Sequence, residues 1–287
     1  MSIYKDGRWA KEIISQQQSD GSWGEFHSLS LPVSGKKITT EQAVGRLLLL
    51  GYTKEDEVIE KALSYMHDCL ASVKRIPDRI EKRMDWQIFV DLMLAVWIRR
   101  FNKEDVLANE VAHKWRIIVE EAFATGEFDQ DRYIKKLYEV LVPSYGTVKR
   151  TKELLRLDYY YPVSILVGEI DKKIEKPYFD YVMDSKTGYY YGYIGAVTKL
   201  PDSFTSREAS RFLSAVEIYC EYNNQYCREK LKVVKEWLVE NRNAEGLWDM
   251  GTEVKDNKYF PLSDSWRTKE LRQIDCSNRI QKILSSI

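Results

Sequence analysis

A single carboxylate interrupts a long apolar run in the first half of the chain. Asp91 has only apolar neighbours between Ile88 and Ile98. Burying such a group costs free energy unless it is paired, and an unpaired one has a raised pKa, as a general acid requires. Asp91 is therefore predicted to be a general acid or a polar anchor for a ligand. The alternative is a structural carboxylate, satisfied by an arginine or by helix N-termini.

Three residues just before Asp91 join it as candidates. Gln87 precedes it by four positions, a spacing that places both side chains on one helical face within hydrogen-bonding reach. Asp85 and Trp86 come about two turns before Asp91. We predict Asp85 as a second acidic candidate, and Trp86 and Gln87 as ligand-binding residues. Core packing is the alternative for the stripe that contains Trp86.

Two charged groups later in the chain are further candidates. Arg207 and Arg211 share one helical face, and arginine binds phosphate and carboxylate groups in a bidentate manner. A solvated surface of salt bridges is the alternative for this pair. Asp264 and Trp266 lie in a segment dense in groups that can pair with one another. We interpret that segment mainly as a lock that closes a ring of helices, with a role at a ligand cavity as the alternative.

Aromatic residues are the third kind of candidate, because the chain has 19 tyrosines and 8 tryptophans. Aromatic faces stabilise carbocations through their quadrupole and also stack on sugar rings. Packing is the alternative for most of them. The predicted ligand-binding aromatic residues are Tyr160, Tyr161, Tyr190 and Trp248, in addition to Trp86 and Trp266.

Helices must position these side chains, because almost every long periodic segment has helical spacing. The predicted helices cover residues 39–51, 53–70, 77–101, 103–125, 131–141, 148–157, 206–222, 225–240 and 277–287, with a hairpin or extended loop at 189–197. Successive antiparallel pairs of this kind predict an all-α fold in which a closed ring of helical hairpins surrounds an axial cavity. An open solenoid is the competing arrangement, but neither end of the chain has the polar capping unit that a solenoid needs.

Composition bounds the function. At 287 residues the chain is long for one domain, but helical barrels reach this length as one unit, so we expect a single domain over residues 1–287. Lysine plus arginine equals aspartate plus glutamate, 44 of each, which gives no general attraction to nucleic acid. No apolar run approaches the ~20 residues that span a bilayer. We therefore expect a cytoplasmic protein with no transmembrane segment and no nucleic-acid partner, whose oligomeric state stays open.

The cysteines predict neither a metal site nor a redox site. The chain has four, and they lack the Cys-x-x-Cys spacing of zinc and redox motifs. Reduced, mostly buried thiols are the simplest interpretation. The cysteines are Cys69, Cys220, Cys227 and Cys276.

A turn with a glycine and a tryptophan two residues later occurs near both ends of the chain. Gly21 and Trp23 follow one predicted helix, and Gly246 and Trp248 follow another. Glycine can take the left-handed conformation that ends a helix, and the tryptophan can then fold back onto that helix. A degraded third copy has Tyr190 in place of the tryptophan. This recurrence indicates one supersecondary unit that is used more than once.

The turn and its preceding helix resemble the QW repeat of the terpenoid cyclases and protein prenyltransferases. The resemblance covers both ends of the chain, through the segment from Gln18 to Gly24 and the segment from Pro261 to Arg267. It implies an α/α toroid, an inner ring of helices wrapped by an outer ring, with an axial cavity for an apolar ligand of isoprenoid type.

The known catalytic motifs of that superfamily do not occur in this chain. The Asp-x-Asp-Asp acid of squalene-type cyclases has only an incomplete counterpart, Asp129-Gln130-Asp131, which is expected to cap a helix. The zinc set of protein prenyltransferases is missing, since Asp275 and Cys276 are adjacent and no histidine follows His113. The aspartate-rich Asp-Asp-x-x-Asp motif is absent too. The resemblance thus implies the fold without the chemistry, and we expect no metal and no cofactor.

Three functional hypotheses follow. The first is a toroid whose aromatic cavity binds a small apolar molecule and, if the protein is an enzyme, transforms it with Asp91 as the acid. The second is a carbohydrate-binding or carbohydrate-processing toroid, which needs two carboxylates roughly 5 to 10 Å apart across the cavity. The third is a non-catalytic interaction scaffold that is filled by its own side chains.

Overall fold

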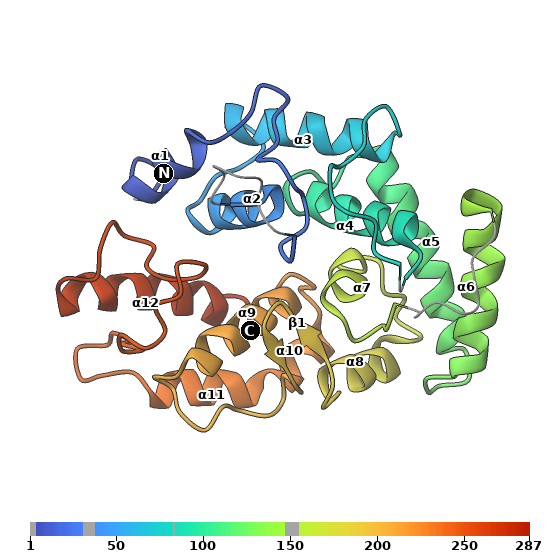
Figure 1. Ribbon diagram of the computed structural model, residues 1–287. Helices are drawn as coiled ribbons and strands as arrows, with labels where there is room; N and C mark the ends of the chain where they lie inside the picture. Colours follow the sequence, from blue (N-terminus) through green and yellow to red (C-terminus); the bar gives the residue numbers. More distant parts are fainter. Residues whose placement is uncertain (1–3, 31–37, 83, 147–154) are drawn as a thin grey trace. The chain divides into compact units, whose positions relative to one another are not determined.

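The computed structural model describes residues 4–30, 38–82, 84–146 and 155–287 (Figure 1). Within these ranges the chain forms twelve helices and one two-stranded hairpin, which confirms the all-α prediction. The chain divides into two compact units, and the boundary at Val111 falls inside a helix. Unit 1 comprises Met1–Val111 and Asn257–Ser265, and unit 2 comprises Ala112–Asp256 and Trp266–Ile287.

Unit 1 is built from helices that carry much of its apolar core. They are α1 (Arg8–Ile14), α2 (Thr40–Leu49), α3 (Glu57–Leu70), α4 (Trp86–Phe101) and the first residues of α5 (Val106–Ala122). The helix α3 packs against α4, and α1 against α2. Eleven of the sixteen residues of α4 are buried, as its continuous apolar sequence predicts.

Local side-chain chemistry sets where two of these helices begin. Thr39 caps α2 with a capping box, because its hydroxyl accepts from the backbone N–H of Gln42 while the Gln42 side chain accepts from Thr39 N–H. Thr53 and Asp56 have the spacing of a similar box. Instead, Asp56 accepts from the backbone N–H of Thr53 at 2.7 Å and from Lys5 at 2.6 Å, and α3 begins one residue after it.

The predicted helix over residues 77–101 is half wrong. Of the described residues in this range only Trp86–Phe101 are helical, and residues 75–81 form neither helix nor strand. The preceding segment is basic, and its Asp78 side chain is turned inward, where it binds backbone groups of another loop. Those bonds are incompatible with a solvent-facing position on a helix. Pro77 is therefore not the first residue of a helix, as its position in the sequence had suggested.

Unit 2 contains the remaining helices and the hairpin, β1 (Tyr189–Tyr190) and β2 (Tyr193–Ile194), whose strands pair antiparallel. The hairpin lies against α9, and α9 also contacts α10 and α12, while α10 packs on α8. The helices are α6 (Gln130–Tyr145), α7 (Tyr160–Ile165), α8 (Glu175–Met183), α9 (Arg207–Cys220), α10 (Gln225–Lys230), α11 (Lys232–Glu240) and α12 (Lys269–Leu284).

Several predicted boundaries in unit 2 differ from the structure. The helix α6 continues past Pro143 to Tyr145, because a proline in the last turn removes only one helical hydrogen bond. The predicted helix over 225–240 is two helices separated at Leu231, and α12 begins eight residues before its predicted start. Asp129 caps α6 by accepting from the N–H of Arg132, as expected. The predicted helix over 148–157 falls mostly outside the described residues.

The two tryptophan turns have the same hydrogen bonds. The indole N–H of Trp23 donates to the carbonyl ten positions earlier in α1, at 2.7 Å, and that of Trp248 does the same in α11, at 2.6 Å. Each tryptophan backbone N–H donates to a hydroxyl of a later helix, Thr40 or Ser277. Both side chains are buried, with exposures of 0% and 3%. The prediction of one recurrent unit is confirmed at this level.

Glycine is required in both turns. Gly21 and Gly246 have φ of 94° and 82°, in the left-handed region that favours glycine. A Cβ at Gly21 would also collide with the carbonyl oxygen of Lys61 in α3. Glycine therefore allows each turn to end its helix, and at Gly21 it also allows the turn to lie against the backbone of α3.

Two further turns have a glycine followed by an aromatic residue in place of the tryptophan. Tyr190, in the expected degraded copy, donates its hydroxyl proton to the carbonyl of Val182 in the last turn of α8, at 2.9 Å. The sequence analysis missed another copy after α5, where Gly126 has φ of 92° and Phe128 stacks on Tyr181 with ring centroids 4.3 Å apart. The Gly-x-aromatic spacing was the signal for this copy.

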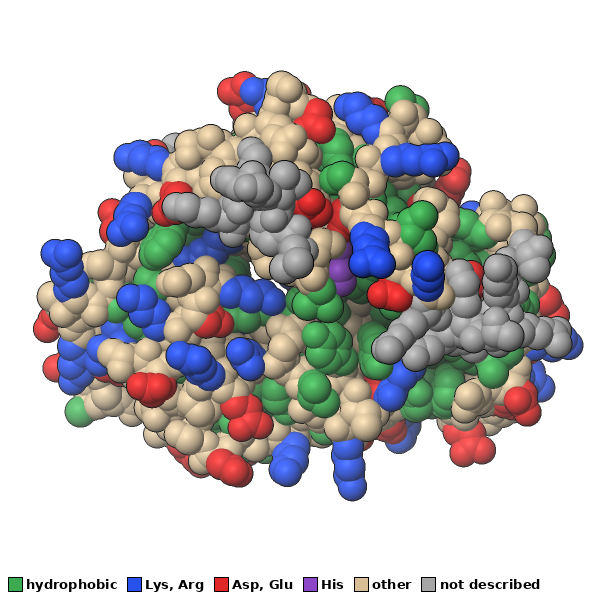
Figure 2. Space-filling view, viewed as in Figure 1, with side chains coloured by type: hydrophobic (Ala, Val, Ile, Leu, Met, Phe, Trp, Pro, Cys, Tyr) green, Lys and Arg blue, Asp and Glu red, His purple; other side chains and the backbone are tan. Residues whose placement is uncertain are grey.

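Among the helices that the structure describes, none is both long enough and apolar enough to cross a membrane. Figure 2 shows acidic and basic side chains interspersed over the visible surface, in line with the equal numbers of the two charges.

A pH-dependent clamp joins α8 to α10. Asp180 accepts from Lys176 at 2.6 Å, from Lys230 at 2.8 Å and from the Tyr226 hydroxyl at 2.7 Å. Partial burial favours a higher pKa for Asp180, but these three hydrogen bonds outweigh it and lower the pKa from 3.8 to about 2.

We expect this clamp to stabilise unit 2 above pH 3.8 and to be lost as the pH falls through about 2. Because the carboxylate is one-third exposed, the contribution is discounted to about 1 kcal/mol. Urea unfolding measured across this pH range should show a smaller pH dependence for Asp180→Asn than for the wild type. The exposed Asp202→Asn serves as control, and an identical pH dependence in Asp180→Asn and wild type would contradict the expectation.

Candidate functional site

The predicted acid lies at the edge of α4 and not in its core. Asp91 is half-buried, and Gln87, one turn earlier, donates its amide N–H to Asp91 Oδ1 at 2.7 Å. The predicted hydrogen bond is therefore present. The expectation that apolar neighbours enclose Asp91 is wrong, because Gln87 and Asp91 share the one helical face that reaches solvent while the other faces of α4 are buried.

Aromatic rings lie on other faces of the same helical turns, and Phe89, two positions from both Gln87 and Asp91, is on the opposite, buried face. Trp86 is half-buried, and its ring lies 5.7 Å from that of Phe89. The other neighbour of Phe89 is His27, whose imidazole meets it edge to face at 5.3 Å. Phe89, Gln87 and Asp91 all belong to the first turns of α4. The structure thus brings an imidazole to the helix that carries the predicted acid.

A buried carboxylate fixes the loop that presents His27. Asp78 is 7% exposed, and its two oxygens accept from the backbone N–H groups of Phe26, at 2.6 Å, and His27, at 2.8 Å. The same carboxylate accepts the Ser30 hydroxyl at 2.6 Å. Hydrogen bonds to a charged acceptor are stronger than neutral ones, so Asp78 holds the loop in one conformation.

A second buried carboxylate completes this support. Glu41, at the start of α2, is 1% exposed. It accepts from the backbone N–H of Ser28 and from the indole N–H of Trp97 in α4, both at 2.7 Å. Glu41 thereby joins the His27 loop to α4, which makes it the enclosed acid that the sequence analysis assigned to Asp91.

The sequence analysis missed His27, Asp78 and Glu41. Their supporting bonds run to backbone groups more than ten positions away, which no local spacing shows. The sequence contained one indication of these roles: Glu41 is an acidic residue in the first turn of a helix that Thr39 caps. Asp85, the second acidic candidate, is half-buried at the N-cap of α4 and makes no side-chain capping bond there.

The chemistry of this region of unit 1 follows from its groups. An imidazole and a carboxylate can accept or donate a proton, and a carboxamide can orient the carboxylate. The half-buried ring of Trp86 supplies apolar surface on the same turns of α4, and the buried Phe89 supports it. Such a combination suits a ligand that is mostly apolar and has one polar group. We call His27, Trp86, Gln87, Phe89 and Asp91 the α4 site.

The predicted tyrosines of unit 2 are mostly core residues. Tyr160, Tyr161 and Tyr190 have exposures of 6%, 7% and 1%. The Tyr161 hydroxyl bonds to that of Tyr191, and the Tyr160 ring meets the Tyr191 ring edge to face at 4.4 Å. Aromatic surface is presented instead by the half-buried Tyr159, Tyr189 and Tyr191.

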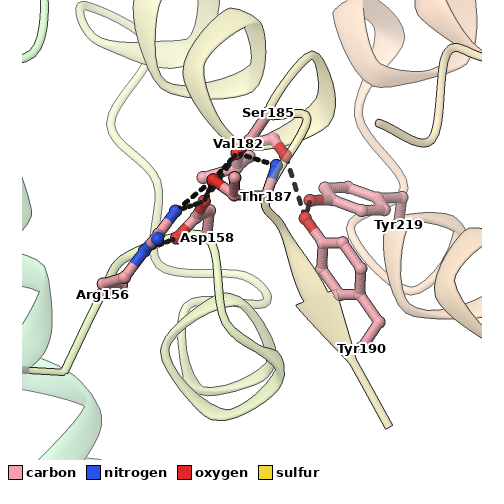
Figure 3. A network of polar contacts seen from close by, with 7 residues as sticks. All are labelled: Arg156, Asp158, Val182, Ser185, Thr187, Tyr190 and Tyr219. Atoms are coloured by element: carbon pink, nitrogen blue, oxygen red, sulfur yellow. Dashed lines mark hydrogen bonds and ion pairs between the residues drawn. The ribbon is translucent and has the colours of Figure 1, made fainter. Parts of the chain in front are cut away.

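Hydroxyl groups in this core form two chains of fixed direction. Tyr190 donates its single proton to Val182, so Tyr219 must donate to Tyr190, at 2.6 Å (Figure 3). Likewise Tyr222 donates to Val163, so Tyr178 donates to Tyr222, at 2.9 Å. Burial raises the pKa of all four hydroxyls, so they remain protonated and structural. Tyr190 therefore has a packing role in the structure.

An ion pair between the buried Asp158 and the exposed Arg156 lies close to the first of these chains (Figure 3). Asp158 is 1% exposed and accepts two bonds from Arg156, at 2.9 and 2.5 Å, and one from the Ser185 hydroxyl, at 2.6 Å. The Arg156 guanidinium also bonds to Thr187. These contacts join the start of α7 to the turn after α8. Every group in the network is bonded to another protein group, which indicates a structural role.

The remaining predicted residues are dispersed. Arg207 and Arg211 are exposed on α9, and Arg207 donates to the carbonyl of Glu253 at 2.9 Å. Neither forms an ion pair with a residue that the structure describes. In unit 1, Asp264 accepts from the backbone N–H of Arg8 at 2.6 Å and so caps α1.

Trp248 and Trp266 both have structural contacts in unit 2. Trp248 is the buried tryptophan of the second turn described above. The indole N–H of Trp266 donates to the buried Asp275 at 2.7 Å. Nearby, Arg272 holds Asp249 through two bonds, at 2.5 and 2.8 Å. The structure does not bring these residues together with the tyrosines of β1.

The cysteines carry no reactive site. All four are free, and three are buried, as predicted. Burial raises the pKa of Cys69 to about 11 and that of Cys220 and Cys276 to about 12, which leaves the thiols protonated. In the described part of the chain, no three His, Cys, Asp or Glu side chains gather as they would around a metal ion.

Comparisons of the chain with protein-family models, with curated proteins and with solved structures find no match. The α4 site and the recurrent tryptophan turn are the two features that bear on the function of this protein.

Proposed function

We propose that this protein binds a small apolar ligand of isoprenoid type, and that its helices form an α/α toroid like those of the terpenoid cyclases and protein prenyltransferases. The support for the toroid is the tryptophan turn, whose glycine, indole bond and backbone bond recur at both ends of the chain. A unit that recurs with the same bonds is typical of repeat architectures.

The observation that carries the ligand class is the α4 site. The Gln87–Asp91 pair is accessible on one face of α4. The half-buried Trp86 lies on the same turn and packs on the buried Phe89, which His27 contacts from the other side. Ligand sites are mostly apolar with a few placed polar groups, and this site has that composition. Buried Asp78 and Glu41 hold the His27 loop in place before a ligand arrives, which lowers the entropic cost of binding.

The role of each group follows. Trp86, supported by the buried Phe89, contacts the hydrocarbon part of the ligand, and Asp91 accepts a hydrogen bond from its polar end. Gln87 positions the Asp91 carboxylate. If the ligand is transformed, Asp91 or His27 supplies the proton transfer, since a carboxyl group and an imidazole can each donate or accept a proton.

The first experiment is native mass spectrometry of the purified protein, followed by solvent extraction of whatever it carries. We expect a co-purifying isoprenoid, or binding of added farnesol detected by quenching of tryptophan fluorescence. The proposal would be contradicted by a co-purifying sugar, or by a protein that carries no ligand and whose tryptophan fluorescence does not change when farnesol is added.

Asp91→Ala should raise the Kd for farnesol about tenfold or more, because a hydrogen bond to a charged acceptor contributes about 1.5–3 kcal/mol. The fold should be unaffected, since Asp91 reaches solvent. The matched control is Glu229→Ala in α10, where Gln225 makes the same kind of amide–carboxylate bond at 3.1 Å. Equal Kd values for the two variants would remove Asp91 from the site.

A further inference from the structure

The segment between α3 and α4 is unusually exposed. Residues 73–82, called the strap, contain no helix or strand, and most of their side chains reach solvent. Val73 and Ile80 are 73% and 66% exposed, whereas Asp78 is the one buried side chain of the strap. Asp78 therefore anchors an extended segment that otherwise points outward.

The strap carries cations without partners. Lys74 pairs with Asp68 at 2.8 Å. Arg75, Arg79 and Lys82 form no ion pair with a described residue. In the helix just before the strap, by contrast, the exposed Lys61 pairs with Glu57 at 2.6 Å. Arg75, Arg79 and Lys82 outnumber the one exposed acidic residue of the strap, Glu81, so the strap is locally positive in a chain whose total charge is balanced.

Exposed aliphatic side chains lie among these cations. Leu29 is 72% exposed and belongs to the loop that Asp78 holds through His27 and Ser30. Leu29 and Ile80 are therefore adjacent to the same anchor. Of the five large apolar side chains at least 66% exposed among the described residues, three belong to this surface. Such clustering marks an interaction surface, whereas single exposed apolar residues do not.

We propose that the strap and Leu29 dock on an anionic lipid surface. Lipid headgroups supply the negative charge that Arg75, Arg79 and Lys82 lack within the protein, and each such cation contributes to attraction near the membrane. The aliphatic tips of Leu29, Val73 and Ile80 insert at the level of the headgroups.

A protein partner fits this surface less well. A stable protein interface buries about 800 Å² on each side and centres on packed aromatic residues. The strap offers one extended segment with separate aliphatic tips and no aromatic residue, which is enough for a lipid surface. The inference rests on the strap and not on the proposed ligand, so a failure of farnesol binding would leave it standing.

The test is sedimentation of the full-length protein with phospholipid vesicles. We expect binding to vesicles that contain phosphatidylglycerol and much weaker binding to vesicles of phosphatidylcholine alone, with the difference reduced by added salt. In the triple variant Arg75→Gln, Arg79→Gln, Lys82→Gln the affinity should fall about fivefold per charge, on the order of 100-fold in total.

Two controls separate this surface from general effects. The triple variant Lys186→Gln, Lys199→Gln, Arg242→Gln removes the same charge from exposed positions of unit 2 and should bind like the wild type. Val106→Ser, at a side chain 69% exposed, is the control for Ile80→Ser, which should weaken binding about tenfold.

Three results would overturn the inference. They are equal binding of wild-type protein to both kinds of vesicle, equal losses in the strap and control variants, and self-association of the protein that the strap variants abolish. The last result would identify a second copy of the chain as the occupant.

Discussion

Trp23→Ala is expected to lower the free energy of unfolding of unit 1 by about 3–5 kcal/mol, the cost of truncating a buried aromatic side chain. Trp23 is fully buried and bonds to Ile13 of α1 and Thr40 of α2, so truncation leaves a cavity where these two helices meet the turn. It also removes the donor to the Ile13 carbonyl. Urea denaturation monitored by circular dichroism measures the change.

Two further variants separate the contributions of apolar volume and of the indole hydrogen bond to this loss of stability. Trp23→Phe keeps most of the apolar volume and loses the indole hydrogen bond, so its cost should be closer to about 1–2 kcal/mol. Trp86→Ala, at a half-buried tryptophan of the same unit, should cost less than Trp23→Ala. If Trp23→Ala proved no worse than Trp86→Ala, the recurrent turn would not be a stabilising unit.

Asp78→Asn should destabilise unit 1 by about 2–4 kcal/mol although the side chain keeps its size. Both carboxylate oxygens accept hydrogen bonds, from Phe26 N–H on one side and from His27 N–H and the Ser30 hydroxyl on the other. An asparagine must turn its NH₂ group toward one of these sides, where a donor then faces a backbone donor. A buried unsatisfied N–H and the lost charge-assisted bonds together account for the magnitude.

Hydrogen exchange is the direct readout for this variant. The amides of Phe26 and His27 should exchange much faster in Asp78→Asn, because their acceptor is lost. Asp68→Asn is the matched control, since Asp68 pairs with Lys74 at the surface and such pairs contribute at most about 1 kcal/mol. Unchanged protection of the two amides would show that Asp78 does not hold the loop.

The helical architecture was predictable because its causes are local. The periodicity of 206–222 and the polar cap at Ser206 predict α9 to within two residues at its end. The glycine and tryptophan of each turn likewise act on the helix immediately before them, so their spacing in the sequence is sufficient to predict the turn.

The strap and the α4 site show where that reasoning fails. Residues 77–85 have adequate helical composition, but Asp78 makes its bonds to a loop about fifty positions earlier, and those bonds decide the backbone. Asp91 has apolar neighbours in sequence. Which face of its helix stays open is decided by the packing of α3, of Glu41 and of His27 against α4, and sequence spacing does not show that packing. The roles of Glu41 and His27 depend on the same tertiary contacts.

Unit 1 also has a consequence for how the chain is made. Arg46, buried in α2, donates to the carbonyls of Lys258 and Pro261, and the Trp9 indole donates to that of Ser263 at 2.9 Å. The ribosome synthesises these acceptors only after all of Ala112–Asp256. The N-terminal helices are therefore the first to emerge and among the last to gain their native partners. Contacts so distant in sequence slow folding, and the nascent unit must avoid aggregation until they form.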